Sequence, residues 1–125
     1  MRQIVFAALL AAAVLGVSAC SGNDYSSPSA PSGSPTPPAG AIVIDVVREN
    51  GAQSFSPNPA TIPAGQMVSW HNIDTVVHRV ALNAGELDTG NIAPGAFSAP
   101  MNLPAVGPYH CTIHPDMVGT LVTGQ

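Results

Sequence analysis

The sequence predicts an all-β domain over residues 41–125: a Greek-key antiparallel β-sandwich of roughly seven to eight strands. Two observations support this prediction. Within these residues Val and Ile number 16 against four Leu, and such an excess of β-branched side chains favours strands over helices. Proline and glycine recur between short apolar runs, and no segment places its apolar residues at the 3.6-residue period of an amphipathic helix.

The expected strands are short apolar runs bounded by turn-forming residues. The first, residues 41–48, is apolar on both faces, so we expect it to be central or covered. Residues 55–59 are expected to bend, because their two prolines cannot occupy the interior of a strand ladder. The other strands are expected at residues 60–63, 66–72, 75–82, 96–101, 107–112 and 118–123.

Strand alternation indicates which side chains enter the core. Val68 and Trp70 are two residues apart, so they point to the same face of their strand, and we expect Trp70 to pack in the core. Residues 87–95 are rich in turn-forming residues and are expected to be mostly turn. Residues 113–117 form a short connection between the last two strands.

Two segments precede the domain. Residues 1–19 combine Arg2, a 13-residue apolar run and small residues before Cys20, which resembles a bacterial lipoprotein signal peptide. In that family the cysteine becomes the lipidated first residue, so the resemblance implies a lipid on Cys20. Residues 20–40 are rich in Ser, Pro and Gly, and we expect a disordered tether. The expected location is the periplasmic or cell-surface side of a bacterial membrane; a cleaved secretory signal is the alternative.

The charge composition excludes one broad class of function. Charged residues make up 8% of the chain, and the basic residues are three arginines with no lysine. A protein that binds nucleic acid needs a cluster of basic side chains to neutralise phosphates. We therefore expect no nucleic-acid partner.

The single domain cysteine lies in a dense group of metal-binding side chains. Cys111, His114 and Met117 follow a C-x2-H-x2-M spacing, and His78 lies 33 residues upstream on a different expected strand. Two imidazoles, one thiolate and one weak axial thioether form the ligand set of a blue-copper site. The pattern predicts one copper ion that alternates between Cu(I) and Cu(II), held by His78, Cys111, His114 and Met117.

The domain resembles a bacterial cupredoxin of the plastocyanin/amicyanin type, the blue type 1 copper proteins. The resemblance implies the same four ligands and a protein that shuttles single electrons between transient redox partners as a monomer. Many family members have Asn directly after the first ligand histidine, and this chain has Arg79 there, which leaves the redox potential open. The matching segments are residues 55–57, 60–65, 68–72, 74, 78, 87–95 and 109–119.

Other histidines are weaker candidates for the metal. His110 neighbours Cys111 on a strand and must point to the opposite face. His71 neighbours Trp70, which is expected in the core, so His71 is expected to face solvent. An immunoglobulin-like disulfide between Cys20 and Cys111 is excluded, because Cys20 lies on no expected strand.

Alternative functions use the same residues differently. Zinc suits a thiolate with two imidazoles but not a methionine. The remaining alternatives are a copper-delivery protein and a metal-free structural β-sandwich. An enzyme is not expected, because a copper oxidase or reductase needs further copper sites. Around His114 we expect an apolar surface for electron exit, formed by Pro94, Met101, Leu103 and Pro115; Tyr109 and His110 could form a second route.

Overall fold

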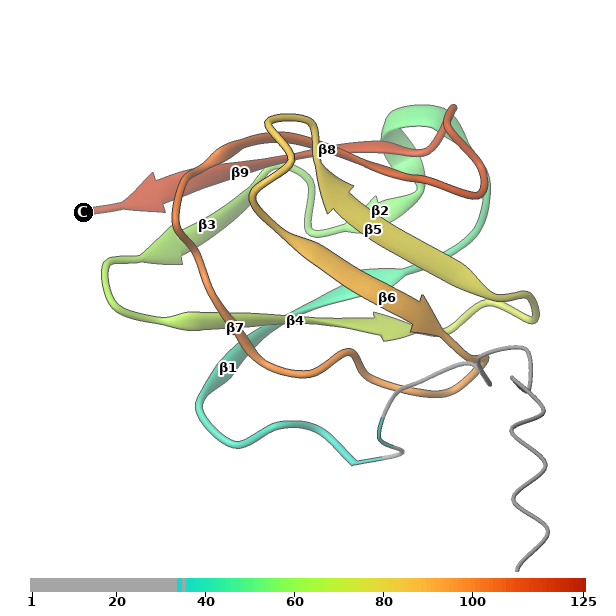
Figure 1. The fold of residues 1–125 in the computed structure, drawn as a ribbon, viewed down its shortest axis with the longest axis horizontal. Helices are drawn as coiled ribbons and strands as arrows, with labels where there is room; N and C mark the ends of the chain where they lie inside the picture. Colours follow the sequence, from blue (N-terminus) through green and yellow to red (C-terminus); the bar gives the residue numbers. More distant parts are fainter. Residues whose placement is uncertain (1–33, 35) are drawn as a thin grey trace, which may run out of the picture.

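A computed structural model describes Ser34 and residues 36–125 (Figure 1). The expected signal peptide and Cys20 lie outside the described residues, as does most of the expected tether. Among the described residues, no helix has the length and apolar character needed to cross a membrane.

The described residues form two sheets, a four-stranded sheet and a five-stranded sheet. The first has the order β2 (Phe55–Ser56), β1 (Ala41–Val46), β4 (Met67–Asn72) and β7 (Met101–Asn102). The second has the order β3 (Ala60–Pro63), β9 (Val118–Gly124), β8 (Gly107–Cys111), β5 (His78–Leu82) and β6 (Asp88–Ile92). A single 3-10 turn, η1 (Gly51–Gln53), precedes β2.

This arrangement confirms the predicted all-β sandwich. The sheets are mixed, however, because β1 pairs with β4 and β3 pairs with β9 in parallel, whereas the other pairings are antiparallel. Two parallel neighbouring strands cannot be joined by a tight hairpin, so they need a longer crossover connection. Here β2 and β3, with their connection, carry the chain from β1 across to the second sheet before β4 returns to the first (Figure 1).

The largest difference from the predicted elements is β6, which replaces part of the turn expected at residues 87–95. Its sequence DTGNI has little apolar character, which an edge strand tolerates because one of its sides has no strand neighbour. A register shift separates Arg79 from Ala81 in the pairing with β5. At this shift the Thr89 hydroxyl oxygen accepts the Val80 N–H at 2.9 Å.

Two further expected elements differ from the structure. Phe55–Ser56 forms a short strand before the bend that the prolines impose. The strand expected at residues 96–101 is reduced to β7, Met101–Asn102, preceded by an isolated bridge between Phe97 and His71. Between them the Ser98 hydroxyl takes the Trp70 N–H that a strand neighbour's carbonyl would otherwise accept. The Ser98 hydroxyl accepts the Trp70 N–H at 2.9 Å, and the Ser98 N–H donates to the Trp70 carbonyl at 2.8 Å.

The core lies between the two sheets and contains side chains from both. Trp70 and Tyr109 are fully buried, and their rings meet edge to face with centroids 5.6 Å apart. Phe55 adds a second edge contact to Tyr109, at 4.8 Å. Burial of Val68 and Trp70 confirms the predicted inner face of this strand. The other members are Ile44, Val46, Ala60, Ile62, Val80, Leu82, Leu87, Ile92, Ala96, Cys111, Met117 and Leu121.

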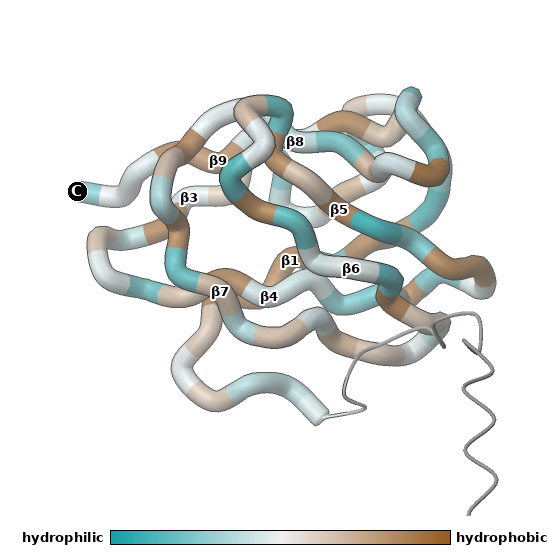
Figure 2. Tube along the Cα trace, in the orientation of Figure 1, coloured by the Kyte–Doolittle hydropathy of each residue, from teal (hydrophilic) through white to brown (hydrophobic). Residues whose placement is uncertain are grey.

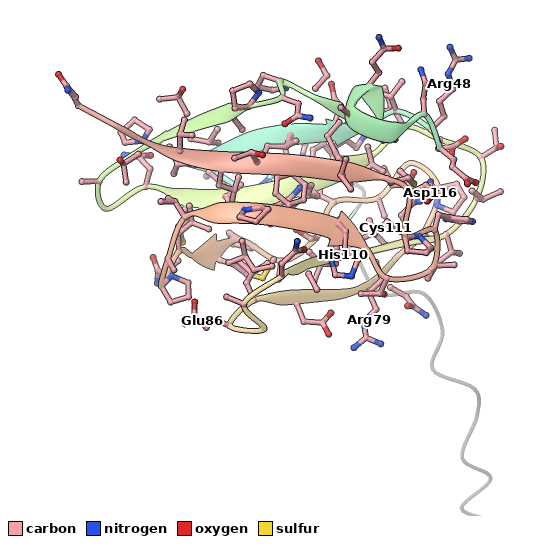
Figure 3. All side chains as sticks on the ribbon, turned by 90° about the horizontal axis from the view of Figure 1, so that it is seen from above. Arg48, Arg79, Glu86, His110, Cys111 and Asp116 are labelled. Carbon is pink, nitrogen blue, oxygen red and sulfur yellow. The ribbon has the colours of Figure 1, made fainter. Side chains whose placement is uncertain are left out.

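Two connections lie together at the end of the sandwich opposite the C terminus. One joins β4 to β5 and the other joins β8 to β9, and both are on that side in Figure 1. Figure 2 shows hydrophobic stretches along both connections, outside the sheets. In Figure 3, Cys111 and Asp116 lie at this same end. The expected metal ligands fall on or beside these two connections.

Candidate metal centre

The two sheet-borne candidates come from neighbouring strands. His78 is the first residue of β5 and Cys111 is the last residue of β8, and the antiparallel register pairs Val80 with Cys111. His78 and Val80 are two residues apart, so both side chains face the interior, and both are buried. The strand pairing therefore brings His78 beside Cys111 although 33 residues separate them in the sequence.

Three donor atoms converge between these strands and the β8–β9 connection. The Cys111 Sγ lies 3.6 Å from His78 Nδ1 and 3.8 Å from His114 Nδ1. The two Nδ1 atoms are 3.3 Å apart. His78 and Cys111 are completely buried, whereas His114 is partly exposed. The structure thus brings together three of the four predicted ligands in one cluster.

Backbone hydrogen bonds hold the connection that carries His114. The Cys111 N–H donates to the Met117 carbonyl at 3.0 Å, which closes the loop at its base. The Met117 N–H donates to the His114 carbonyl at 3.0 Å, and the Thr112 N–H donates to the Arg79 carbonyl at 2.7 Å. Met117, the fourth predicted ligand, is fully buried where β9 is about to begin. The loop therefore has a fixed shape and a fixed attachment to β5.

A carboxylate outside the cluster orients the ring of His78. Asp74 Oδ2 lies 2.9 Å from His78 Nε2. An ionised carboxylate only accepts hydrogen bonds, so Nε2 carries the proton and donates it to Asp74. Nδ1 is then the atom that faces Cys111 and His114. It can donate a hydrogen bond to the Cys111 thiolate in the metal-free protein and, once it has lost its proton, can bind a metal.

The surroundings favour the thiolate form of Cys111. Burial alone raises the pKa of the thiol, but the hydrogen bond with His78 and the backbone groups of Arg79, His114 and Ile113 outweigh it and lower the pKa to about 6. For His78, burial lowers the pKa, while Cys111 and Asp74 raise it above its usual value. Since the thiolate is the form that binds metals, the site is prepared for a soft metal ion.

The donor set and its spacing fit one copper ion. Two ligand atoms that are each about 2.0–2.3 Å from the same ion lie roughly 3.3–4 Å apart, which matches the three separations in this cluster. One thiolate with two imidazoles suits both oxidation states of copper, since sulfur favours Cu(I) and nitrogen suits Cu(II). The cofactor prediction, a single copper ion, is consistent with this cluster.

The other histidines lie outside the cluster. His71 contacts Asp45, with Nδ1 and Oδ1 3.1 Å apart, and its ring stacks on Phe97 at a centroid separation of 4.0 Å. His110 Nδ1 lies 2.6 Å from Asn83 Oδ1, on the exposed side of the sheet. Both placements agree with the strand alternation that separated these residues from the predicted ligands.

Arg79, which stands where many members of the family that the sequence resembles have Asn, turns its side chain away from the cluster. Its guanidinium forms two hydrogen bonds with the Asp88 carboxylate, one of them 2.8 Å long, and Figure 3 shows Arg79 pointing out of the sheet. Only its backbone takes part in holding the loop, through the bond from Thr112. Here a main-chain contact secures the ligand loop to β5.

The apolar surroundings expected for His114 are partly wrong. Leu103 lines a cavity of about 300 Å³ with Ile62, Pro63 and Thr123. This cavity lies at the end of the sandwich where β3 and β9 finish, opposite the ligands. The ligand end instead exposes Ile73 and Val76 of the β4–β5 connection and Ile113 of the β8–β9 connection, each 44–49% exposed. The sequence pattern could not show which apolar side chains lie at the ligand end, because the two connections are far apart in the sequence and come together only in the folded sandwich.

The role of Asp74 is the clearest feature that sequence reasoning missed. In the sequence Asp74 is one position of the resemblance, and no pattern there predicts a contact for its side chain. Its spacing of four residues before His78 falls in a connection where no regular period predicts which side chains meet. A carboxylate a few residues before a predicted ligand histidine was the available signal, since such histidines usually donate their second N–H to one.

Comparison with solved structures identifies the fold. A reduced variant of amicyanin matches with a TM-score of 0.56 and 23% identity over 77% of this chain and 95% of that chain. A Cu(I) form of another amicyanin variant has a TM-score of 0.54 and 26% identity over 75% and 95%. A purple cupredoxin from Nitrosopumilus maritimus has a TM-score of 0.53 and 25% identity over 66% and 98%. No protein-family model and no curated protein sequence matches the chain.

Proposed function

We propose that this domain, which has the cupredoxin fold, is a blue-copper electron carrier with His78, Cys111, His114 and Met117 as its ligands. The convergence of one thiolate and two imidazole Nδ1 atoms within 3.3–3.8 Å carries the proposal. Met117 is buried, and its backbone carbonyl accepts the Cys111 N–H. Its thioether would supply the weak fourth ligand that distinguishes a blue-copper site from a zinc site.

Copper bound here would supply reversible one-electron chemistry. The chain's residues would keep the site unchanged between the two oxidation states. Cys111 and His78 lie at the ends of paired strands, and His114 lies in a loop closed by backbone hydrogen bonds, so none of the three is free to rearrange. Burial of Cys111 and Met117 would keep water away from a bound copper ion. A rigid site needs little reorganisation when an electron arrives or leaves, and this favours transfer over chemistry on a substrate.

The partly exposed edge of His114 is the proposed exit for the electron. It is the most accessible of the four ligands, and the exposed apolar side chains of Ile73, Val76 and Ile113 lie on the two connections at the same end. Small apolar contacts suit weak, transient encounters with redox partners. The domain carries two arginines against six acidic residues, so a partner with a basic or neutral docking face is favoured.

We further propose that the domain works at a membrane surface as a monomer on a lipid anchor. The order of Arg2, apolar run and small residues before Cys20 supports this, as does the tether that follows. Replacing Cys20 with Ser in the full chain should move the protein from the membrane fraction to the soluble fraction. Retention of this variant on the membrane would contradict a lipid on Cys20.

A copper titration tests the proposed electron transfer. The domain with Cu(II) should develop an intense visible band from thiolate-to-copper charge transfer, at one copper per chain, and the band should bleach on reduction and return on oxidation. Cys111→Ser should abolish the band. His71→Ala is the matched control, because His71 lies outside the cluster, and it should keep the band. A wild-type complex that stays colourless or cannot be reduced reversibly would refute electron transfer at this site.

A further inference from the structure

Asp74 stands apart from the four proposed ligands, yet it forms the shortest side-chain contact to any of them. From this geometry we infer that Asp74 is a positioning residue that fixes His78 with Nδ1 toward the metal and favours Cu(II) over Cu(I). The inference rests on the proposed copper site and adds a determinant of its affinity and potential. The contact is a 2.9 Å hydrogen bond from His78 Nε2–H to Asp74 Oδ2.

Both ends of the Asp74 side chain are restrained. Its second oxygen, Oδ1, accepts the Thr75 N–H at 2.7 Å and lies 3.5 Å from the Thr75 hydroxyl. The carboxylate is 18% exposed and is therefore largely withdrawn from solvent. A charge–dipole contact in such a place is weakened little by water or salt.

The backbone that carries Asp74 is fixed by Asn72, the last residue of β4. Asn72 is completely buried, and its Oδ1 accepts the Asp74 N–H at 3.0 Å. Its Nδ2 donates to the Val76 carbonyl at 2.7 Å and to the Ile92 carbonyl at 2.9 Å. One buried amide thus ties the β4–β5 connection to itself and to β6. Asp74 is thereby held in place for His78 independently of any bound metal.

The two proposed imidazole ligands are therefore unequal. His78 is buried and hydrogen-bonded to a carboxylate, whereas His114 is partly exposed and, among the described residues, has no hydrogen bond to a carboxylate. A carboxylate that accepts the far N–H increases electron density on the imidazole and makes it a stronger donor. A stronger nitrogen donor stabilises Cu(II) more than Cu(I), which lowers the reduction potential.

Removal of this hydrogen bond is the direct test. Asp74→Ala removes the acceptor, and Asp74→Asn keeps the shape without the charge. We expect the dissociation constant for Cu(II) to rise about 10- to 100-fold, with a smaller change for Cu(I). Each tenfold loss of Cu(II) affinity without an equal loss of Cu(I) affinity raises the reduction potential by about 59 mV for a one-electron couple. Voltammetry and competition titrations with chelators of each copper ion measure these quantities.

The matched control is Asp45→Asn, which removes the same charge from the other histidine–carboxylate pair. Asp45 contacts His71, at 3.1 Å, and neither residue belongs to the cluster. This variant should leave both copper affinities within about twofold of wild type. The reduction potential should then be nearly unchanged. A shift of the potential as large as that of Asp74→Asn would show that removing any nearby negative charge has this effect, and it would overturn the role assigned to Asp74.

A measurement on the metal-free protein separates orientation from potential. Nitrogen-15 NMR of the imidazoles should show His78 protonated at Nε2 in the wild type, and a loss of this preference in Asp74→Ala. An unchanged tautomer together with an unchanged potential would overturn the inference while the wild type still forms the copper band. A wild type that forms no such band would refute the copper site itself, and the inference with it.

Discussion

Both sheets of the sandwich contribute side chains to the core, but they contribute unequally to the metal centre. The five-stranded sheet carries His78 and Cys111 at adjacent strand ends, and its β8–β9 connection carries His114 and Met117. The four-stranded sheet supplies Trp70 and none of the four proposed ligands. Its contribution to the site is indirect, through Asn72 at the end of β4 and the connection that follows.

This difference indicates that stability and copper chemistry are separable in the molecule. Side chains at the centre of the sandwich should affect folding with or without the metal. A partly exposed side chain at the ligand end, such as His114, should affect mainly the folded protein's copper affinity and potential. The predictions below test this separation, from the largest expected change in unfolding free energy to the smallest.

Trp70→Ala should produce the largest loss. Trp70 is fully buried and contacts Tyr109 edge to face, and replacing such a side chain by Ala typically costs about 3–5 kcal/mol. Chemical denaturation of the metal-free domain measures this loss. A cost below about 1 kcal/mol would show that the four-stranded sheet contributes less to the core than its burial indicates.

Copper should stabilise the domain through the ligand end. At free copper about 100 times the dissociation constant, linkage adds about 2.7 kcal/mol to the unfolding free energy. His114→Ala should lose most of this gain while changing the metal-free stability by no more than about 0.5 kcal/mol, because His114 is partly exposed. Denaturation with and without copper measures both values. An equal copper gain in the variant would contradict the role of His114 as a ligand.

Gly119→Ala tests close packing inside the ligand-bearing sheet. A Cβ at Gly119 would overlap the Tyr109 ring, which lies across the β8–β9 pairing, so the buried ring or the strand must shift. Such overpacking typically costs about 1–3 kcal/mol. Gly65→Ala is a suitable control for lost glycine, because a Cβ there meets no atom within 4 Å, although its φ of 78° favours glycine. A smaller cost for Gly119→Ala than for Gly65→Ala would contradict the predicted overlap.

Asp88→Asn should have the smallest effect. The Asp88–Arg79 pair is about half exposed, so its loss should cost less than about 1 kcal/mol. The hydrogen bond from Arg79 lowers the pKa of Asp88. Since the folded pKa is depressed, the pair stabilises the protein above the ordinary carboxyl pKa of about 3.9, and this stability disappears as pH falls through the lowered value. The unfolding free energies of wild type and variant should therefore converge in strong acid. A difference that grows as pH falls would contradict the stabilising direction of this ion pair.

The sequence predicts features that depend on local patterns in the chain better than features that depend on contacts between distant segments. The β-sandwich and the positions of Cys111, His114 and Met117 follow from patterns that are local in the chain. His78 was identified because its residue type completes a known ligand set. By contrast, β6 was missed because an edge strand needs no apolar alternation.

Contacts made by irregular connections were beyond sequence reasoning. Asp74 and His78 meet only because Asn72 shapes the chain between β4 and β5, and no periodicity encodes that shape. The apolar side chains near the ligand end were misassigned for the same reason. Leu103 is apolar and lies in a loop, but the fold carries that loop to the other end of the sandwich.

X-ray absorption at the copper edge tests the central claim most directly, because it measures the ligand atoms themselves. The account predicts one sulfur and two imidazole nitrogens around the ion in the wild-type domain, and loss of the sulfur in Cys111→Ser. A wild-type copper shell of nitrogen and oxygen atoms alone, unchanged by Cys111→Ser, would contradict the proposed copper centre.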